Sequence, residues 1–285
     1  DPPLGQESIS KIVDHAQESA CGGLDAFLRW VQERLAMLLN KKLFSHFADK
    51  AQKTYVDLLC LGLGYTAVVT ADGGLGIAYT YYEDKKSCMA LNESPDYEGR
   101  PAAELLEKIK SDHPLERSLA LSLVNALNYE DALNLPEDKD NAILFKKFNL
   151  QSKANVAMVG YFGPLVKRLA EKKVSLEILD ISRGLGDRND FYRKLADWAD
   201  VLLLTSTSIL NNTTEEILSH LHKNVKTALL GPSTPMVAEA FAHLPVHMLA
   251  GTVPLDRENI IKAVRHGMGT PVLHRFSRKS YLSLS

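Results

Sequence analysis

The chain has 285 residues, of which 45% are hydrophobic and 24% are charged, and its formal net charge is −2. This composition is typical of a globular protein long enough for two cores. Proteins that bind nucleic acid commonly have a basic face, and a slightly negative net charge does not indicate one. We therefore expect no nucleic-acid partner. No apolar run approaches the roughly 20 residues that a membrane helix needs, so we expect no membrane partner either.

The cysteines and the first residues bear on the cellular compartment. An odd number of cysteines with no CxxC pair is typical of free thiols in a reducing compartment. No segment near residue 1 has the basic and then apolar layout of a signal peptide. We therefore expect a cytoplasmic protein, with its cysteines at Cys21, Cys60 and Cys88.

Residues 1–57 predict helices. An apolar stripe with three- and four-residue spacing runs from Leu24 to Leu38, and a second helix is expected from Phe44 to Leu59. We interpret residues 1–50 as a helical extension. It either packs on the following domain or makes a contact in a homo-oligomer.

Residues 51–150 predict a small α+β domain. The runs Tyr65–Thr70 and Leu75–Tyr82 flank an Asp-Gly-Gly turn, which indicates a β-hairpin. Helices are expected at Pro101–Lys110 and Leu115–Leu127. Two strands followed by helices favour the α+β class. We place the junction with the next domain in the polar segment 131–152.

Residues 151–285 predict a Rossmann-like α/β domain, because short apolar strands alternate with helices, as in a parallel sheet with crossover helices on both faces. The expected strands are Asn155–Val159, Ser175–Leu179, Val201–Thr205, Thr227–Leu230 and Val246–Ala250. The expected helices are Pro164–Lys172, Asp190–Trp198, Thr214–His222, Met236–His243 and Arg257–Arg265. We interpret the basic end as a solvated tail; it contains Arg275, Arg278 and Lys279.

In such sheets, ligands bind beyond the carboxyl ends of the strands, at the point where the strand order reverses. The first loop there contains Gly160, Phe162 and Gly163, and it opens a helix whose free N–H groups suit an anion. This is a GxxG segment and not the full GxGxxG fingerprint. Ligand contact and a purely structural turn therefore stay equally open.

Asp180 ends the second strand of the Rossmann-like domain, 20 positions after Gly160. A carboxylate there commonly accepts hydrogen bonds from ribose hydroxyls, and it would equally suit a polyol or an amine. The alternative is that Asp180 caps the loop that follows it. Since these loops offer no other obvious base, Asp180 is our provisional catalytic residue.

Two further strand ends carry hydroxyl groups. Four consecutive hydroxyl residues begin at Thr205, which is more than a turn requires, and a stiff Gly-Pro loop with backbone N–H groups begins at Gly231. Thr213 is expected to cap the helix after the first of these loops. The candidate ligand contacts in the two loops are Thr205, Ser206, Thr207, Gly231, Ser233 and Thr234.

The first domain offers two more candidates, since binding sites favour domain interfaces. Tyr65 lies in the hairpin, and Asn125 lies late in an apolar helix, where it is either hydrogen-bonded structurally or points into the pocket. The sequence has no HExxH motif, Cys/His cluster, P-loop or GxSxG elbow. We therefore predict no preformed zinc site and leave any metal ligand unassigned.

Several segments resemble a known family in their order and spacing. They are the hairpin 64–76, VNALN at 124–128, VAMVGYFGPL at 156–165, LDIS at 179–182, ADVLLLT at 199–205 and LGPSTPM at 230–236. From about residue 55 to 273 the sequence is similar to the DUF364 family of heavy-metal chelation proteins, with the associated DUF4213 domain in front. The resemblance implies an enolase N-terminal-like domain, a Rossmann-like domain partly similar to methyltransferases, and a site between them. It also implies a role in metal-chelator, pterin or flavin-type metabolism.

A protein that chelates a soft metal directly would offer Cys or clustered His as ligands, and the site loops offer neither. Their oxygen and N–H groups favour a small anionic, oxygen-rich metabolite, bound or processed in the interdomain cleft. The sequence does not identify a cofactor, and a metal ion or a metal-chelator complex stays open. It also leaves open whether the protein is an enzyme. One alternative is a methyltransferase that uses S-adenosylmethionine, with Asp180 on the ribose. Another is a non-catalytic metallochaperone or metal sensor that uses Cys60 or Cys88.

Overall fold

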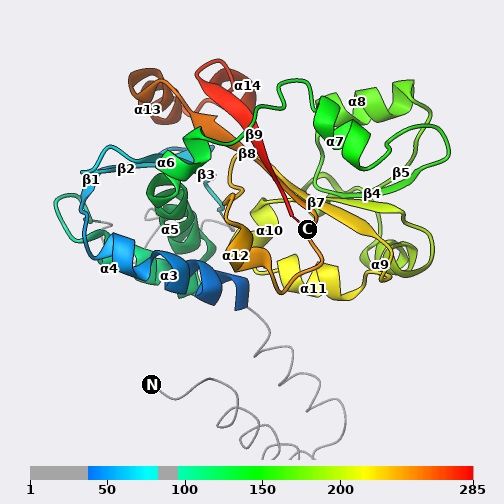
Figure 1. Cartoon of the computed structure of the whole chain (residues 1–285), viewed down its shortest axis with the longest axis horizontal. Coiled ribbons are helices and arrows are strands. Elements are labelled where there is room, and N and C mark those ends of the chain that lie inside the picture. Colours follow the sequence, from blue (N-terminus) through cyan, green and yellow to red (C-terminus); the bar gives the residue numbers. More distant parts are fainter. Residues whose placement is uncertain (1–37, 83–95, 285) are drawn as a thin grey trace, which may run out of the picture. The chain divides into compact units, whose positions relative to one another are not determined.

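Two β-sheets organise the part of the chain that the computed structural model describes, residues 38–82 and 96–284. The first sheet is antiparallel, with strand order β1-β2-β3, and the second has the order β5-β4-β6-β7-β8-β9 (Figure 1). The strands are β1 Val56–Leu61, β2 Tyr65–Thr70, β3 Leu75–Tyr79, β4 Asn155–Val159, β5 Ser175–Leu179, β6 Val201–Thr205, β7 Lys226–Leu230, β8 Met248–Pro254 and β9 Ser277–Ser283. The α-helices are α3 Leu38–Ala51, α4 Ala102–Leu106, α5 Pro114–Leu127, α6 Tyr129–Leu133, α7 Ala142–Lys147, α8 Gly163–Glu171, α9 Arg188–Asp197, α10 Thr207–Leu210, α11 Thr214–Ser219, α12 Ala238–Phe241, α13 Arg257–Arg265 and α14 Thr270–Leu273.

Helices cover both faces of the antiparallel sheet, which explains why every residue of β2 is buried. Successive side chains of a strand point to opposite faces. Val68 packs in a cluster with residues of α5, whereas Ala67 and Val69 pack with residues of α13. Because α13 follows β8 in the sequence, the C-terminal part of the chain completes the core of the first sheet.

The six-stranded sheet is also covered on both faces. Leu202 and Leu204 of β6 pack in a cluster with residues of α9, α10, α11 and α12, whereas Leu203 packs with residues of α7 and α8. Figure 1 shows α7 and α8 on one side of this sheet and α9 and α11 on the other. Strands β4 to β8 are parallel, so the expected Rossmann-like sheet with helices on both faces is confirmed.

A single buried cluster connects the two sheets. It runs from Leu119 and Leu123 of α5 to Leu202 of β6 and Phe241 of α12. The described residues from 39 onward accordingly form one compact unit. The division into domains 51–150 and 151–285 stays a prediction.

Most expected elements are present, including the hairpin, α5, the strands β4 to β8 and the helices α8, α9, α11 and α13. Some bounds differ from the prediction: β3 ends at Tyr79, α11 ends at Ser219, and β8 runs from Met248 to Pro254. The expected helix Met236–His243 is shorter and covers Ala238–Phe241, because Val237 has an extended backbone. Residues Thr207–Leu210 form the unexpected helix α10.

The expected helix Phe44–Leu59 is wrong in its second half. Helix α3 ends at Ala51, and β1 begins at Val56 and pairs with β2, with Cys60 opposite Ala67. Pairing with a buried hairpin strand decides the conformation of these residues, since strand propensity depends strongly on such context. The apolar stripe before Leu38 lies outside the described residues.

The prediction of a solvated basic tail is also wrong. Residues Ser277–Ser283 form β9, which pairs antiparallel with the whole of β8. The Arg278 side chain donates a hydrogen bond to the carbonyl oxygen of Leu133 at 2.7 Å. The sheet is therefore mixed, with its one antiparallel strand at the edge.

Candidate functional site

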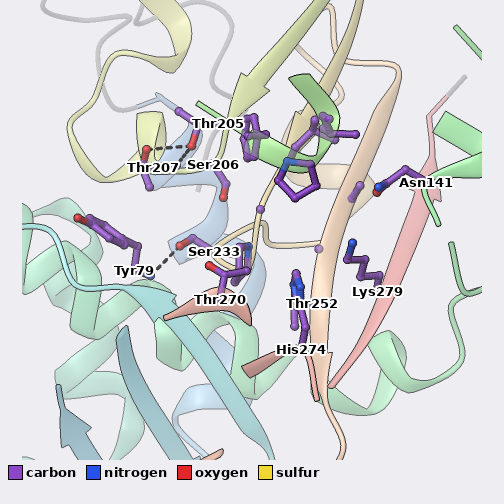
Figure 2. A pocket seen from close by; sticks show the side chains of 18 of the residues that line it. Tyr79, Asn141, Thr205, Ser206, Thr207, Ser233, Thr252, Thr270, His274 and Lys279 are labelled. Carbon is purple, nitrogen blue, oxygen red and sulfur yellow. Dashed lines mark hydrogen bonds between the residues drawn. The ribbon is translucent and has the colours of Figure 1, made fainter. Parts of the chain in front are cut away.

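A cavity of about 430 Å³ lies at the carboxyl ends of β4, β6 and β7 (Figure 2). Strands β5 and β6 flank β4 on opposite sides, so the strand order reverses there. This is the place where doubly wound sheets bind ligands. The antiparallel sheet contributes Tyr65 and Tyr79 to the lining, and β9 contributes Lys279 and Ser280.

The loop after β4 forms one wall. Gly160 has φ +83°, and a Cβ there would lie 3.0 Å from the Cβ of Thr205, so the glycine allows the ends of β4 and β6 to approach. Phe162 and Gly163 line the cavity, whereas Gly160 does not. Tyr161 also lines it, with the guanidinium of Arg183 4.9 Å from the centre of its ring.

The loop after β6 supplies a cluster of hydroxyls. Thr205, Ser206 and Thr207 all line the cavity, and the Oγ1 atoms of Thr205 and Thr207 lie 3.0 Å apart. The backbone N–H of Ser206 donates to the carbonyl oxygen of Leu230 at 2.8 Å, which ties this loop to the end of β7. Gly231 has φ +129°, and a Cβ there would lie 2.7 Å from Ser206 Oγ.

The loop after β7 reaches the antiparallel sheet. Ser233 lines the cavity, and its Oγ accepts a hydrogen bond from the backbone N–H of Tyr79 at 2.7 Å. Tyr65 is buried, and its hydroxyl lies 2.6 Å from Thr270 Oγ1. Burial raises the pKa of the Tyr65 phenol. These contacts place β2 and β3 on the cavity wall that faces the strand ends.

The strongest polar group of the cavity was missed by sequence reasoning. Lys279 and Thr252 are opposite residues of the antiparallel pair β9 and β8, and both line the cavity. Figure 2 shows them with His274 on one side of the pocket, and Thr205, Ser206 and Thr207 on the other. Among the residues that the structure describes, no carboxylate lies within ion-pair distance of Lys279 Nζ.

His274, the residue that follows α14, was also missed by sequence reasoning. Its Nε2 lies 3.4 Å from Thr252 Oγ1. Burial, with a smaller contribution from the nearby charge of Lys279, lowers the pKa of His274 to about 4. The imidazole is therefore neutral at pH 7.

Asp138 is the only acidic residue among the described cavity-lining residues, and both of its carboxylate oxygens accept backbone hydrogen bonds. Its carboxylate oxygens accept hydrogen bonds from the backbone N–H groups of Ile143 and Leu144 at 3.0 and 3.1 Å, at the start of α7. A carboxylate at a helix N-terminus is stabilised there. The carboxylate is held at α7 and forms no ion pair with Lys279, so the ammonium can still donate to an anion in the cavity.

Some predicted residues lie elsewhere. The Asp180 carboxylate accepts hydrogen bonds from Ser182 Oγ and the N–H of Arg183, so Asp180 caps its own loop and does not line the cavity. Asn125 Nδ2 donates to the carbonyl oxygen of Ile77 at 2.9 Å. Asn125 and Thr234 line a separate small hollow.

One local expectation is wrong. Thr213 does not cap α11 with its side chain, and its hydroxyl donates to Asn211 Oδ1 at 2.7 Å instead.

The donor set does not fit a heavy metal held directly by side chains. Among residues 38–82 and 96–284, no three His, Cys, Asp or Glu side chains are grouped in a way that could hold a metal ion. The cavity offers one imidazole and many hydroxyls, which are poor partners for soft metals. Cys60 lies on β1 and does not line the cavity, and Cys21 and Cys88 lie outside the described residues.

Two family models match the chain. DUF4213 matches residues 44–128 and DUF364 matches residues 143–283, and both are described as "Putative heavy-metal chelation". None of the curated proteins matches the chain. No described helix is both long enough and apolar enough to span a membrane.

Solved structures share the fold, among them two of DUF364 proteins described as having unknown function. The one from Pyrococcus horikoshii has a TM-score of 0.70 and 20% identity, over 86% of this chain and 100% of that chain. The one from Desulfitobacterium hafniense has a TM-score of 0.69 and 18% identity, over 88% of this chain and 99% of that chain. Because the two family models together match well over half of the sequence in the expected order, the chain belongs to the DUF364 family and carries the DUF4213 domain in front.

Proposed function

We propose that the cavity binds a small organic anion rich in oxygen, of the chelator, pterin or flavin type. The observation that supports this most is Lys279, a cation in the cavity wall that no described carboxylate neutralises. A partly buried ammonium binds an acidic group through a charge-assisted hydrogen bond, which is stronger than a bond between neutral groups.

The remaining lining supports the same ligand class. Hydroxyls of Thr205, Thr207 and Thr252 can donate to or accept from further oxygens of the ligand. The rings of Tyr79 and Phe162 provide apolar surface for a flat portion. A volume of about 430 Å³ suits a small metabolite and falls in the usual range of ligand pockets.

The heavy-metal description of the family is consistent with this proposal if the ligand, and not the protein, binds the metal. An organic chelator carries its own oxygen donors, so the protein can recognise the chelator or its metal complex without a cluster of soft side chains. Under this proposal the metal is cargo of the ligand. Whether the bound molecule is also processed is a separate matter. Asp180, the base predicted from the sequence, caps its own loop and is not part of the cavity lining.

A panel of anions tests the proposal. We expect at least one of citrate, 2,3-dihydroxybenzoate, a pterin carboxylic acid and flavin mononucleotide to raise the Tm of the protein and to bind at 1:1 stoichiometry in calorimetric titration. The Lys279→Met variant should weaken that binding by about 10- to 100-fold, because a hydrogen bond to a charged group contributes about 1.5–3 kcal/mol.

A matched control is the Lys262→Met variant, which removes an exposed lysine from α13. It should leave the affinity unchanged. The proposal fails if no member of the panel binds, or if Lys279→Met and Lys262→Met bind equally well.

A further inference from the structure

Three groups from separate elements meet on the side of the cavity opposite the hydroxyl cluster. Antiparallel pairing of β8 and β9 sets Thr252 directly across from Lys279, so their side chains share one face of the sheet. The residue after α14, His274, reaches the same place and lies 3.4 Å from Thr252 through its Nε2. All three line the cavity.

This arrangement pairs a proton acceptor with a cation. An imidazole nitrogen can take a proton from a ligand, and a neighbouring ammonium stabilises the anion that remains. We propose that His274 is the proton-accepting residue of the cavity and that, with Lys279, it converts a weakly acidic hydroxyl of the bound ligand into its anionic form. This inference rests on the proposed function, because it concerns a ligand in the same cavity.

The step is a simple proton transfer. The O–H bond of the ligand breaks, the proton forms a bond with a ring nitrogen of His274, and the electron pair stays on the ligand oxygen next to Lys279 Nζ. The substrate class is a catechol, enol or hydroxamic acid, whose oxygen must lose its proton before it can bind a metal. The site would therefore hold a chelator in its donor form.

The other ionisable groups around His274 do not suit this role. The carboxylate of Asp138 already accepts two backbone N–H groups, and burial raises the pKa of the Tyr65 phenol, which keeps its proton and contacts Thr270. Because burial and the charge of Lys279 lower the pKa of His274, its ring is unprotonated at pH 7. The same shift makes the imidazole a weak base in the empty cavity, so proton transfer requires the charge of the bound anion. The remaining titratable groups in the described lining are Lys279, Tyr79 and Tyr161.

An anionic ligand would complete the transfer. Once the anion lies between the imidazole and the ammonium, its opposite charge favours the protonated ring and raises the pKa of His274. The proton is then held by the protein and does not escape to solvent. This retention distinguishes a proton-accepting residue from a merely electrostatic site.

The test uses 4-nitrocatechol, a chelator-type phenol whose visible spectrum changes when it loses a proton. At a pH where the free probe is mostly protonated, the bound probe should show the spectrum of its anion. Titration calorimetry in two buffers with different ionisation enthalpies should give the same heat, because the proton moves to His274. One proton released to buffer for each bound probe would overturn the inference on the wild-type protein alone.

Variants separate the roles of the two residues. His274→Gln keeps a side chain that can bond to Thr252 but cannot accept the proton, so the probe should bind in its protonated form. His266→Gln, an exposed histidine after α13, is the matched control and should behave as wild type. An unchanged anion spectrum in His274→Gln would contradict the inference.

Failure of the inference and of the proposed function can be told apart. If 4-nitrocatechol does not bind the wild-type protein, the weakly acidic ligand class is wrong, while the anion panel still decides the proposed function. If the probe binds and Lys279→Met weakens it, but the proton leaves to buffer, anion binding stands and the role of His274 falls.

Discussion

His274 links the cavity to the stability of the fold. Its folded-state pKa of about 4 lies below its ordinary value of 6.5, so between these pH values the unfolded chain binds a proton that the folded chain does not. The stabilising contribution is fully present above pH 6.5 and is lost as the pH falls toward 4. His274→Gln should reduce the loss of unfolding free energy between pH 7 and 4.5 by about 1–2 kcal/mol.

Urea denaturation at a series of pH values measures this effect. His266→Gln serves as the control and should keep the wild-type slope, because that side chain is exposed. Identical pH profiles for wild type and His274→Gln would mean that the imidazole is not held neutral by its surroundings.

At the scale of single residues, strand-end position predicted one half of the cavity and missed the other. Thr205 ends β6, Ser206 follows it, and Ser233 follows β7. The carboxyl ends of parallel strands meet at one edge of the sheet whatever the details of packing. The position of Lys279 in the cavity depends instead on which strand β9 pairs with. The sequence of β9 is mostly polar and has no apolar alternation that would predict this pairing. The sequence alone could not tell whether Asp180 binds a ligand or caps the loop that follows it. In the structure its carboxylate caps the loop.

At the scale of elements, the packing of β3 on α5 depends on Gly76. A Cβ on this residue would lie 2.1 Å from the carbonyl oxygen of Ser122 and 2.2 Å from the N of Ala126, both in the backbone of α5. Gly76→Ala should therefore force the helix away and lower the free energy of unfolding by about 3 kcal/mol or more.

Gly73 in the same hairpin is the matched control. It has φ +90° and open space around its Cβ position, so Gly73→Ala should cost about 1–2 kcal/mol from backbone strain alone. Urea denaturation of both variants gives the comparison. An equal loss in the two would argue against close packing between β3 and α5.

Elements with a clear period were predictable, and elements defined by their partners were not. Strands β4 to β8 alternate with helices in a pattern that few other folds produce. The residues of β1 follow α3 closely in the sequence and were predicted as the end of a helix, whereas pairing with β2 makes them a strand. Strand β9 is largely polar on both faces and is held by backbone bonds to β8.

At the scale of the whole described unit, the shared core predicts cooperative unfolding. One buried cluster spans α5, β6 and α12, and α13 covers the antiparallel sheet although it follows β8. Far-UV circular dichroism and the fluorescence of Trp198, in a variant with Trp30→Phe, should report one coincident urea transition for this unit. Two separate transitions would show that the predicted domains unfold independently.

The position of α13 was beyond sequence reasoning, because a helix after a parallel strand ordinarily covers its own sheet. Here its apolar residues Ile260 and Val264 pack against β2 and β3. The same crossing brings α14 and then β9 to the cavity. The resemblance to DUF364 and DUF4213 predicted the fold class with its two kinds of sheet, but not this exchange of packing.

The most direct test of the central claim is the ratio of dissociation constants for an organic anion between Lys279→Met and the wild-type protein, measured by titration calorimetry with Lys262→Met as control. We predict a ratio of about 10 to 100 for Lys279→Met and about 1 for the control. A ratio near 1 for Lys279→Met would contradict the account, because the anion would then bind without the cation of the cavity.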